Sequence, residues 1–265
     1  MSADAAFFAA IRETLFSGRL SQAQVDGVTR IARAARDYGC EPAQGAYILA
    51  TAHWETGRRM QPVREGFAKT DEAAIAAVTR LHREGRISRN YALPDPETGQ
   101  SYFGRGDVQL THRFNYADWS ARLGLDLVND PGLALDPAIS ARILVEGSMR
   151  GTFTGRALPS YVSGAKRDFT GARRVINGTD KATEIAALAE RYLAAIEAGM
   201  AAARAADIGN PISPLAPPAA PPPAPRPEPR AEADLIRLET RLAALEADLA
   251  AARAWRERVK AAVAA

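Results

Sequence analysis

Two glutamates, Glu55 and Glu65, precede a loop at residues 102–111 that is rich in glycine, aromatic and amide side chains. Hydrolysis of a glycosidic bond needs a pair of carboxyl groups, because one carboxylic acid protonates the leaving oxygen and a second carboxylate activates water or attacks the sugar. Carboxylates are common in proteins, so the pair alone has little specificity. The residues around the pair, and the elements that position them, decide whether it forms an active site.

Glu55 is expected in the last turn of a helix. This helix is predicted to begin after Glu41, with Pro42 in its first turn, and to stop at Gly57. The negative end of the helix dipole and the flanking Trp54 disfavour a charged carboxylate at this position. Such an environment suits a general acid.

Two points about the pair stay open at the level of sequence. Glu55 has a competing interpretation as a surface residue that forms an ion pair with Arg58 or Arg59. Glu65 follows Glu55 after a glycine and a proline, so helical periodicity does not fix the distance between the two carboxyl groups. A separation of roughly 6.5–9.5 Å would indicate inverting chemistry, and a shorter one would indicate retaining chemistry.

The first 205 residues predict an all-α domain, because apolar residues recur with helical spacing and alternating β-branched runs are few. Ser21 is predicted to cap the second helix together with Gln24. Residues 91–111 contain two prolines and three glycines and predict a long loop with a small hairpin, and long loops in compact domains usually carry function. The predicted helices cover residues 7–15, 21–39, 41–57, 71–84, 115–123, 137–149 and 180–203.

The composition excludes several classes of function. The chain has 34 basic and 31 acidic residues, so its net charge of +3 gives no reason to expect a nucleic-acid partner. Cys40 is the only cysteine, and the three histidines lack the spacing of metal ligands. We therefore expect no internal disulfide, no metal and no cofactor.

The beginning of the chain lacks the features of a signal peptide, and no stretch approaches the ~20 apolar residues of a membrane span. We expect a protein without a transmembrane segment that is cytoplasmic as synthesised. If its substrate lies outside the membrane, another protein such as a holin must release it.

A proline-rich segment divides the chain. Ten of the 17 prolines lie between Pro211 and Pro229, which predicts a semi-rigid spacer without a core. The predicted domains are therefore residues 1–205, a Pro/Ala-rich linker at 206–230 and a C-terminal helix at 231–265.

Leucines in this last segment recur at alternating steps of three and four, which is the a/d pattern of a coiled coil over about three heptads. Three interpretations stay open for the segment: a homo-oligomer formed through residues 231–260, docking onto another protein, and a single amphipathic helix that folds back on the domain. The leucines are Leu235, Leu238, Leu242, Leu245 and Leu249.

The order of the motifs is specific. Ala-His-Trp-Glu-Thr-Gly at residues 52–57 comes first, Glu65 follows, and Tyr-Phe-Gly-Arg-Gly-Asp-Val-Gln-Leu-Thr at 102–111 leads to Asn115 and Tyr116. This order resembles glycoside hydrolase family 19, the family of plant chitinases and of many bacteriophage and prophage endolysins. The first motif is similar to the family's His-Glu-Thr-Gly helix end, and the last is close to its Gly-Arg-Gly-x-x-Gln-Leu-Thr/Ser signature.

The resemblance continues downstream and implies a fold. Residues 129–134 and 173–178 are similar to the family's Asn-Pro-Asp-Leu and Ile-Asn-Gly segments, so the resemblance covers roughly residues 5–200. It implies an all-α, lysozyme-like bilobal helical domain with the cleft between the lobes.

The resemblance also implies roles for individual residues. Glu55 matches the general acid, Glu65 the general base, and Thr111 the residue that helps to hold the attacking water. Tyr102 is expected to be a platform for a sugar ring. The expected substrate-binding residues are Tyr102, Gln109, Asn115 and Asn177.

Structural alternatives exist for three of these residues. Asn115 could cap the following helix, Asn177 could belong to a turn with Gly178, and Tyr102 could be a core residue.

One departure from the family concerns the histidine that normally precedes the acid. Trp54 takes that place here and His53 comes one residue earlier, which rotates the imidazole by about 100° on a helix. We therefore interpret His53 as a core residue, and His82 and His112 as surface or helix-cap residues.

The resulting hypothesis is hydrolysis of β-1,4 bonds in peptidoglycan by an inverting mechanism, as in a cell-wall lytic endolysin. A chitinase that acts on N-acetylglucosamine polymers is the alternative with the same chemistry. A lytic transglycosylase would leave Glu65 and Thr111 without a role. A hypothesis of another class is a catalytically silent glycan-binding or tethering protein that works through its C-terminal helix.

Overall fold

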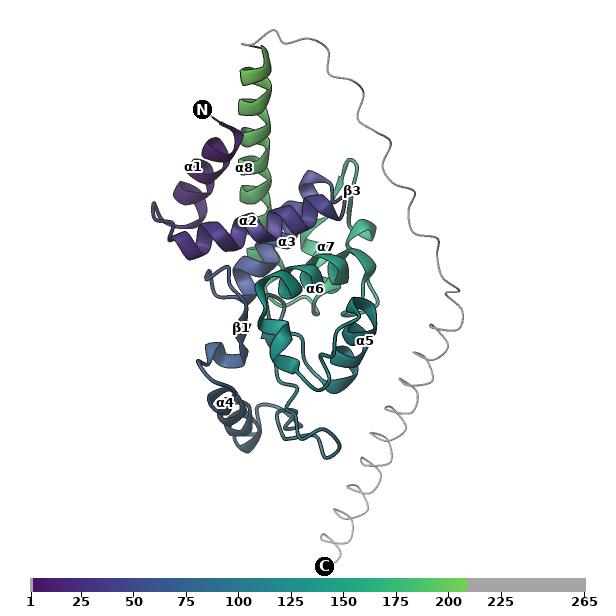
Figure 1. Cartoon of the computed structure of the whole chain (residues 1–265). Helices are drawn as coiled ribbons and strands as arrows, with labels where there is room; N and C mark the ends of the chain where they lie inside the picture. Colours follow the sequence, from purple (N-terminus) through teal and green to yellow (C-terminus); the bar gives the residue numbers. More distant parts are fainter. Residues whose placement is uncertain (1, 209–265) are drawn as a thin grey trace, which may run out of the picture. The chain divides into compact units, whose positions relative to one another are not determined.

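The computed structural model describes residues 2–208. The prediction for 231–265 and almost all of the predicted linker lie outside the described residues. Figure 1 shows that the regular structure of the described part is mostly helical and that long loops connect some of the helices. The helices are α1 (Ala3–Leu15), α2 (Gln22–Asp37), α3 (Pro42–Glu55), α4 (Asp71–Arg83), α5 (Arg113–Leu123), α6 (Pro137–Arg150), α7 (Phe169–Ala172) and α8 (Ala182–Ile208).

Short strands and 3-10 turns connect these helices. β1 pairs antiparallel with β2, with Val63 opposite Gly106 and Arg64 opposite Arg105, and β3 pairs antiparallel with β4. The short elements are β1 (Val63–Arg64), η1 (Glu65–Phe67), β2 (Arg105–Gly106), η2 (Pro131–Leu135), η3 (Leu158–Ser160), β3 (Val162–Ser163), β4 (Lys166–Arg167) and η4 (Arg173–Val175).

Local signals set most helix ends where the sequence predicts them. Ser21 and Gln24 form the predicted capping box of α2, and the Thr70 side chain accepts a hydrogen bond from the Ala73 backbone N–H at the start of α4. Pro42 lies in the first turn of α3, as predicted. α5 begins at Arg113, two residues before its predicted start, so Asn115 is not the N-cap of this helix.

The main hydrophobic core surrounds α3. This helix packs on α8, which also packs on α1, while α2 packs on α6 and α3. Figure 1 shows α1 and α8 side by side at one end of the described part and α4 at the other. Because α3 is buried on nearly every face of its second half, the helix that ends at Glu55 is held rigidly by its neighbours.

A second, smaller core lies under α4. It consists of Ala74 and Val78 from the helix and of Ala92 and Phe103 from the long loop that follows. Two separate cores correspond to two lobes, so the prediction of an all-α, bilobal domain is confirmed for residues 2–208. The hairpin predicted in residues 91–111 takes the form of a bridge between Arg105 and Leu110.

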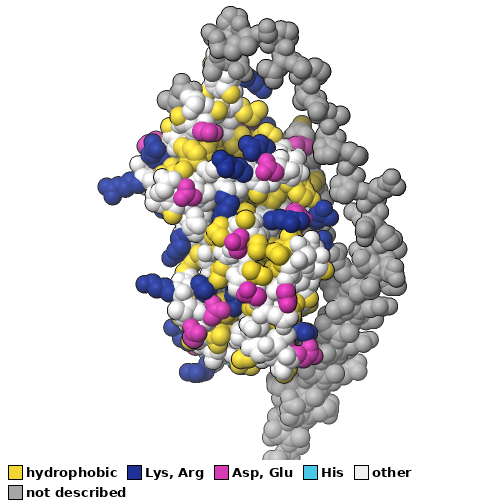
Figure 2. Space-filling model, in the orientation of Figure 1, with side chains coloured by type: hydrophobic (Ala, Val, Ile, Leu, Met, Phe, Trp, Pro, Cys, Tyr) yellow, Lys and Arg dark blue, Asp and Glu magenta, His cyan; other side chains and the backbone are white. Residues whose placement is uncertain are grey.

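The surface carries both charges. Basic and acidic side chains are interspersed over the face shown in Figure 2. Among the helices that the structure describes, none is both long and apolar enough to cross a bilayer.

Candidate active site

Glu55 lies at the C-terminal end of α3 and is held by a cation from a distant segment. Its Oε1 accepts a hydrogen bond of 2.7 Å from Nη1 of Arg173, whose side chain is 5% exposed. The partner is therefore Arg173 and neither Arg58 nor Arg59. Oε2 of Glu55 has no hydrogen-bond partner within residues 2–208, so it is the oxygen that can present a proton to a substrate.

Glu65 begins η1, directly after β1, and both of its carboxylate oxygens are occupied. Tyr91 Oη donates to Oε1 at 2.5 Å, and the Gly104 backbone N–H donates to Oε2 at 2.8 Å. Partial burial and the neighbouring carboxylate raise the pKa of Tyr91, so this phenol keeps its proton and remains a donor. Two donors from different segments therefore fix the orientation of this carboxyl group.

The segments that carry the two carboxylates touch. Phe67, two residues after Glu65, lies so close to Gly57, two residues after Glu55, that a Cβ atom at Gly57 would be 3.0 Å from its ring. The guanidinium of Arg59 covers the same ring at 4.3 Å from its centroid. The turn after α3 and the η1 segment are therefore neighbours in space.

The loop at residues 104–111 is fastened to Glu65 and β1. Gln109 has a φ of +56°, and its Nε2 donates to the carbonyl oxygen of Val63 at 3.0 Å. A side chain at Gly104 would collide with Oε1 of Gln109 and crowd Oε2 of Glu65, so glycine is required for this close approach. The amide nitrogen of Gln109 is thus used to hold the base in place, and sugar binding through this nitrogen does not fit the structure.

Thr111 and Asn115 follow in the same loop. Thr111 Oγ1 donates to the Gln109 carbonyl oxygen at 2.8 Å, and its lone pairs remain available as acceptors. Asn115 Nδ2 donates to the Thr111 carbonyl oxygen at 2.6 Å. Oδ1 of Asn115 has no partner in the described part of the chain. The structure therefore brings Thr111 and Asn115 together next to the loop that binds Glu65.

The structure corrects the prediction that Tyr102 is a platform for a sugar ring. Its side chain is 4% exposed, and its Oη donates to the Val128 carbonyl oxygen at 2.9 Å and lies 2.8 Å from Thr98 Oγ1. A ring buried in the main core has no face to offer a sugar. The structural alternative is correct for this residue. Exposed aromatic rings lie nearby instead, at Phe67 and Phe114.

Two buried charged residues that the sequence did not single out support the loop. Arg105 is 1% exposed, donates to the Ser101 carbonyl oxygen, and forms an ion pair of 2.7 Å with Asp71. Asp107 is fully buried and forms an ion pair of 2.7 Å with Arg30. These contacts tie the loop to α4 on one side and to α2 on the other.

His53 is a core residue, as interpreted from its shifted position. It is 4% exposed, and its Nδ1 lies 3.0 Å from Tyr192 Oη on α8. Burial, and to a smaller extent the charge of Arg58, lower the pKa of His53 to about 4. His112 is exposed at the N-cap of α5 and stacks on Phe114, with ring centroids 5.5 Å apart.

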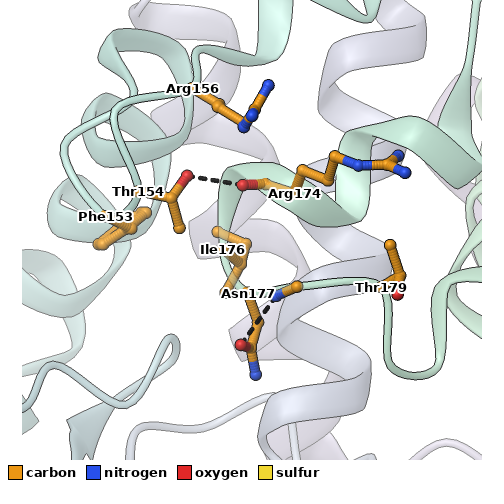
Figure 3. A pocket seen from close by; sticks show the side chains of 8 residues that line it. Phe153, Thr154, Arg156, Arg174, Ile176, Asn177 and Thr179 are labelled. Atoms are coloured by element: carbon orange, nitrogen blue, oxygen red, sulfur yellow. Dashed lines mark hydrogen bonds between the residues drawn. The ribbon is translucent and has the colours of Figure 1, made fainter.

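Asn177 lies on the Glu55 side, in the turn after η4. Its backbone N–H donates to the Arg173 carbonyl oxygen at 3.0 Å, and its Oδ1 accepts from the Gly178 N–H at 2.8 Å. The predicted turn with Gly178 is thus present, and Nδ2 of Asn177 stays free to donate within the described residues. Asn177 lines an open pocket, shown in Figure 3.

Little in the sequence indicates that Arg173 and Tyr91 are partners of the two glutamates. Arg173 belongs to a segment that resembles the family, but its 118-residue separation from Glu55 gives no spacing to follow. Tyr91 opens the predicted loop and carries no motif.

Comparisons with known proteins show that the segment carrying most of these residues is similar to a known family. Residues 45–149 match the sequence model of the family described as chitinase class I. The chain is 29% identical over 150 residues to the basic 30 kDa endochitinase of Solanum lycopersicum, covering 50% of this chain and 44% of that protein. It is 33% identical over 100 residues to an endochitinase of Solanum tuberosum, covering 36% of this chain and 28% of that protein. The chain thus spans less than half the length of these relatives.

Solved structures give weaker similarity. Chitinase C from Streptomyces griseus HUT6037 has a TM-score of 0.48 and 19% identity, covering 73% of this chain and 76% of that chain. A bacterial family 19 chitinase has a TM-score of 0.45 and 24% identity, covering 73% of this chain and 93% of that chain. The matched segment 45–149 contains Glu55, Glu65 and the whole 104–111 loop, so the part of the chain that carries the candidate site is similar to the family described as chitinase class I.

Proposed function

We propose that this chain hydrolyses β-1,4 glycosidic bonds in peptidoglycan by an inverting mechanism with Glu55 as general acid and Glu65 as general base. One observation carries the proposal: the two carboxyl groups are held differently. Glu65 accepts hydrogen bonds at both oxygens, whereas Glu55 keeps one oxygen without a partner among residues 2–208. The fixed orientation of Glu65 suits a base that must face one water molecule, and the open oxygen of Glu55 suits contact with the glycosidic oxygen.

In the proposed reaction, Oε2 of Glu55 donates a proton to the glycosidic oxygen as the bond to the anomeric carbon breaks. Glu65 removes a proton from a water molecule that attacks this carbon from the opposite face of the sugar. Thr111 Oγ1 is proposed to accept a hydrogen bond from this water, because its own proton is already directed to the Gln109 carbonyl oxygen. Asn115 Oδ1 and Asn177 Nδ2 are proposed to contact acetamido and hydroxyl groups of the sugars.

Chitin is the second candidate substrate. The named relatives are endochitinases, and both polymers contain β-1,4-linked N-acetylglucosamine. Peptidoglycan is preferred here because the single cysteine allows no internal disulfide, in keeping with an enzyme that is made in the cytoplasm and then released to the cell wall.

The test is the clearing of permeabilised bacterial cells by the wild type and by Glu55→Gln, with the released fragments analysed by mass. The proposal expects clearing by the wild type, with hydrated reducing ends, and loss of nearly all clearing in the variant. Glu13→Gln is the matched control, because Glu13 is exposed on α1 and the same charge is removed.

Three results would argue against the proposal. Clearing by Glu55→Gln at the wild-type rate would favour a silent tether, and 1,6-anhydro ends would indicate a transglycosylase. Cleavage of colloidal chitin without clearing of cells would identify chitin, and not peptidoglycan, as the substrate. Circular dichroism of Glu55→Gln must match the wild type for the loss to count.

A further inference from the structure

An open pocket of about 570 Å³ adjoins the segment that holds the candidate acid (Figure 3). Arg174, in its lining, directly follows Arg173, which forms the ion pair with Glu55. The pocket lies between the turn after α6 and the η4 segment. The residues that matter for its chemistry are Phe153, Thr154, Arg156, Arg174, Ile176 and Asn177.

The nitrogen-bearing side chains that line this pocket offer donors to a ligand. Thr154 Oγ1 is already directed at the Arg174 carbonyl oxygen at 2.6 Å, which fastens the α6 turn to η4 (Figure 3). Oδ1 of Asn177 accepts from Gly178, so its Nδ2 is the free end of the amide. Arg156 and Arg174 add two guanidinium groups. No carboxylate lines the pocket, so its charge is positive.

Neither arginine is neutralised by the part of the chain that the structure describes. Arg156 has one contact, from Nη1 to Tyr161 Oη at 3.4 Å, and Arg174 forms no ion pair within residues 2–208. Both side chains are exposed. Two unpaired guanidinium groups at one pocket favour a ligand with a carboxylate, because the planar fork of arginine matches the two carboxylate oxygens.

The pocket also has an apolar part that is fixed in place. Phe153 lies directly on Gly147 of α6, where a Cβ atom would come within 2.2 Å of the ring. Ile176 adds a second apolar side chain to the lining. An apolar surface beside a basic rim fits a short alkyl group that carries a carboxylate.

We infer that this pocket binds the peptide stem of peptidoglycan, with stem carboxylates at Arg156 and at Arg174, whose guanidinium groups lie apart in Figure 3, and an alanine methyl group against Phe153. The inference rests on the proposed function. Peptidoglycan carries a lactyl-linked peptide with free carboxylates on every second sugar, whereas chitin carries only neutral acetamido and hydroxyl groups. The pocket therefore supplies a physical reason for this chain to prefer peptidoglycan over chitin.

The first test compares two substrates in the full chain with Arg156→Gln and Arg174→Gln combined. The ratio of kcat/KM on peptidoglycan fragments to kcat/KM on chitooligosaccharides is expected to fall about tenfold, since two exposed charge-assisted contacts are lost. Raising the salt concentration should lower this ratio of kcat/KM values more for the wild type than for the variant, because salt screens the charges of the two arginines. Arg12→Gln combined with Arg19→Gln is the control, because both residues are exposed on or just after α1 and the charge change is the same.

A binding measurement separates this inference from the proposed function. Calorimetry with the Glu55→Gln chain measures the Kd of a disaccharide tetrapeptide and of the same compound with its carboxylates amidated. The inference expects amidation to weaken binding about tenfold, and expects this effect to vanish when both arginines are replaced. Equal Kd values, or an unchanged substrate ratio in the first test, would overturn the inference. Absence of turnover by the wild type would instead contradict the proposed function. In that case the Kd values alone would show whether the pocket binds the peptide stem.

Discussion

Glu55 ends a regular helix buried in the main core, whereas Glu65 follows a two-residue strand in an irregular segment. Glu55 depends on one ion pair from a residue 118 positions away. Glu65 depends on two hydrogen bonds, from Tyr91 and from the backbone of Gly104, and Gln109 and Arg105 fasten the loop to which Gly104 belongs. The difference shows how one fold can hold two carboxyl groups of the same type with different sets of partners, one by a single cation and one by two neutral donors.

The largest expected effect is a loss of kcat, and its dependence on the substrate should differ between Glu55 and Glu65. Glu55→Gln should lower kcat on a natural glycosidic bond about 10³-fold, but much less on an aryl glycoside whose phenol leaves without protonation. Glu65→Gln should lower kcat by a similar factor on both substrates, because each needs an activated water. Steady-state kinetics on the two substrates provide the check, and the reverse pattern would exchange the proposed roles.

The network behind Glu65 can be broken without touching either carboxyl group. Arg105→Met removes a buried guanidinium that contacts Ser101, Tyr116 and Asp71, and should lower the free energy of unfolding by about 3 kcal/mol. Arg64→Met is the control, because Arg64 binds the same aspartate at a more exposed position and should cost about 1 kcal/mol or less. Urea unfolding measures both, and equal losses would contradict the role of Arg105.

The helix that carries Glu55 should be sensitive to acid through His53. The pKa of His53 is about 4 in the folded protein and about 6.5 when unfolded, so only the unfolded chain gains the proton between these values. Stability is therefore complete above pH 6.5 and falls by up to about 3 kcal/mol as the pH approaches 4. The free energy of unfolding, measured with urea, should change less between pH 7 and pH 4.5 for His53→Gln than for the wild type. His82→Gln, at an exposed position on α4, should keep the wild-type change.

A smaller effect is expected from the ion pair that orients the acid. Arg173→Met should lower kcat about tenfold to a hundredfold, because Glu55 loses the contact that fixes its direction. Arg173→Lys should recover part of this loss by restoring the charge. A wild-type kcat in Arg173→Met would show that α3 alone positions Glu55.

Local patterns predicted the fold well because they act over a few residues. The capping box of Ser21 and Gln24 and the proline at the start of α3 are complete within one turn, and both occur where the sequence places them. For the same reason, the local pattern predicted correctly that Glu55 lies at a helix end. Two helix starts were predicted less well: α1 begins at Ala3, four residues before its predicted start, and α5 begins two residues early, after His112, which forms no side-chain cap.

The candidate site was only partly predictable, because its contacts join distant segments. Arg173 reaches Glu55 across 118 residues and Tyr91 reaches Glu65 across 26, and no periodicity encodes either separation. Tyr102 belongs to the motif, but the motif does not reveal whether a ring faces solvent or the core. Burial depends on the packing of Tyr102 against Tyr116 and Val128, which only the three-dimensional structure shows.

The configuration of the first-formed product tests the central claim most directly. Proton NMR recorded during hydrolysis of a β-1,4-linked N-acetylglucosamine oligomer or a peptidoglycan fragment distinguishes the two anomers before they interconvert. If Glu65 activates water against a bond that Glu55 protonates, the new reducing end appears as the α-anomer. An initial β-anomer would mean that a carboxylate attacks the sugar or that two inversions occur, and would contradict the single-step mechanism.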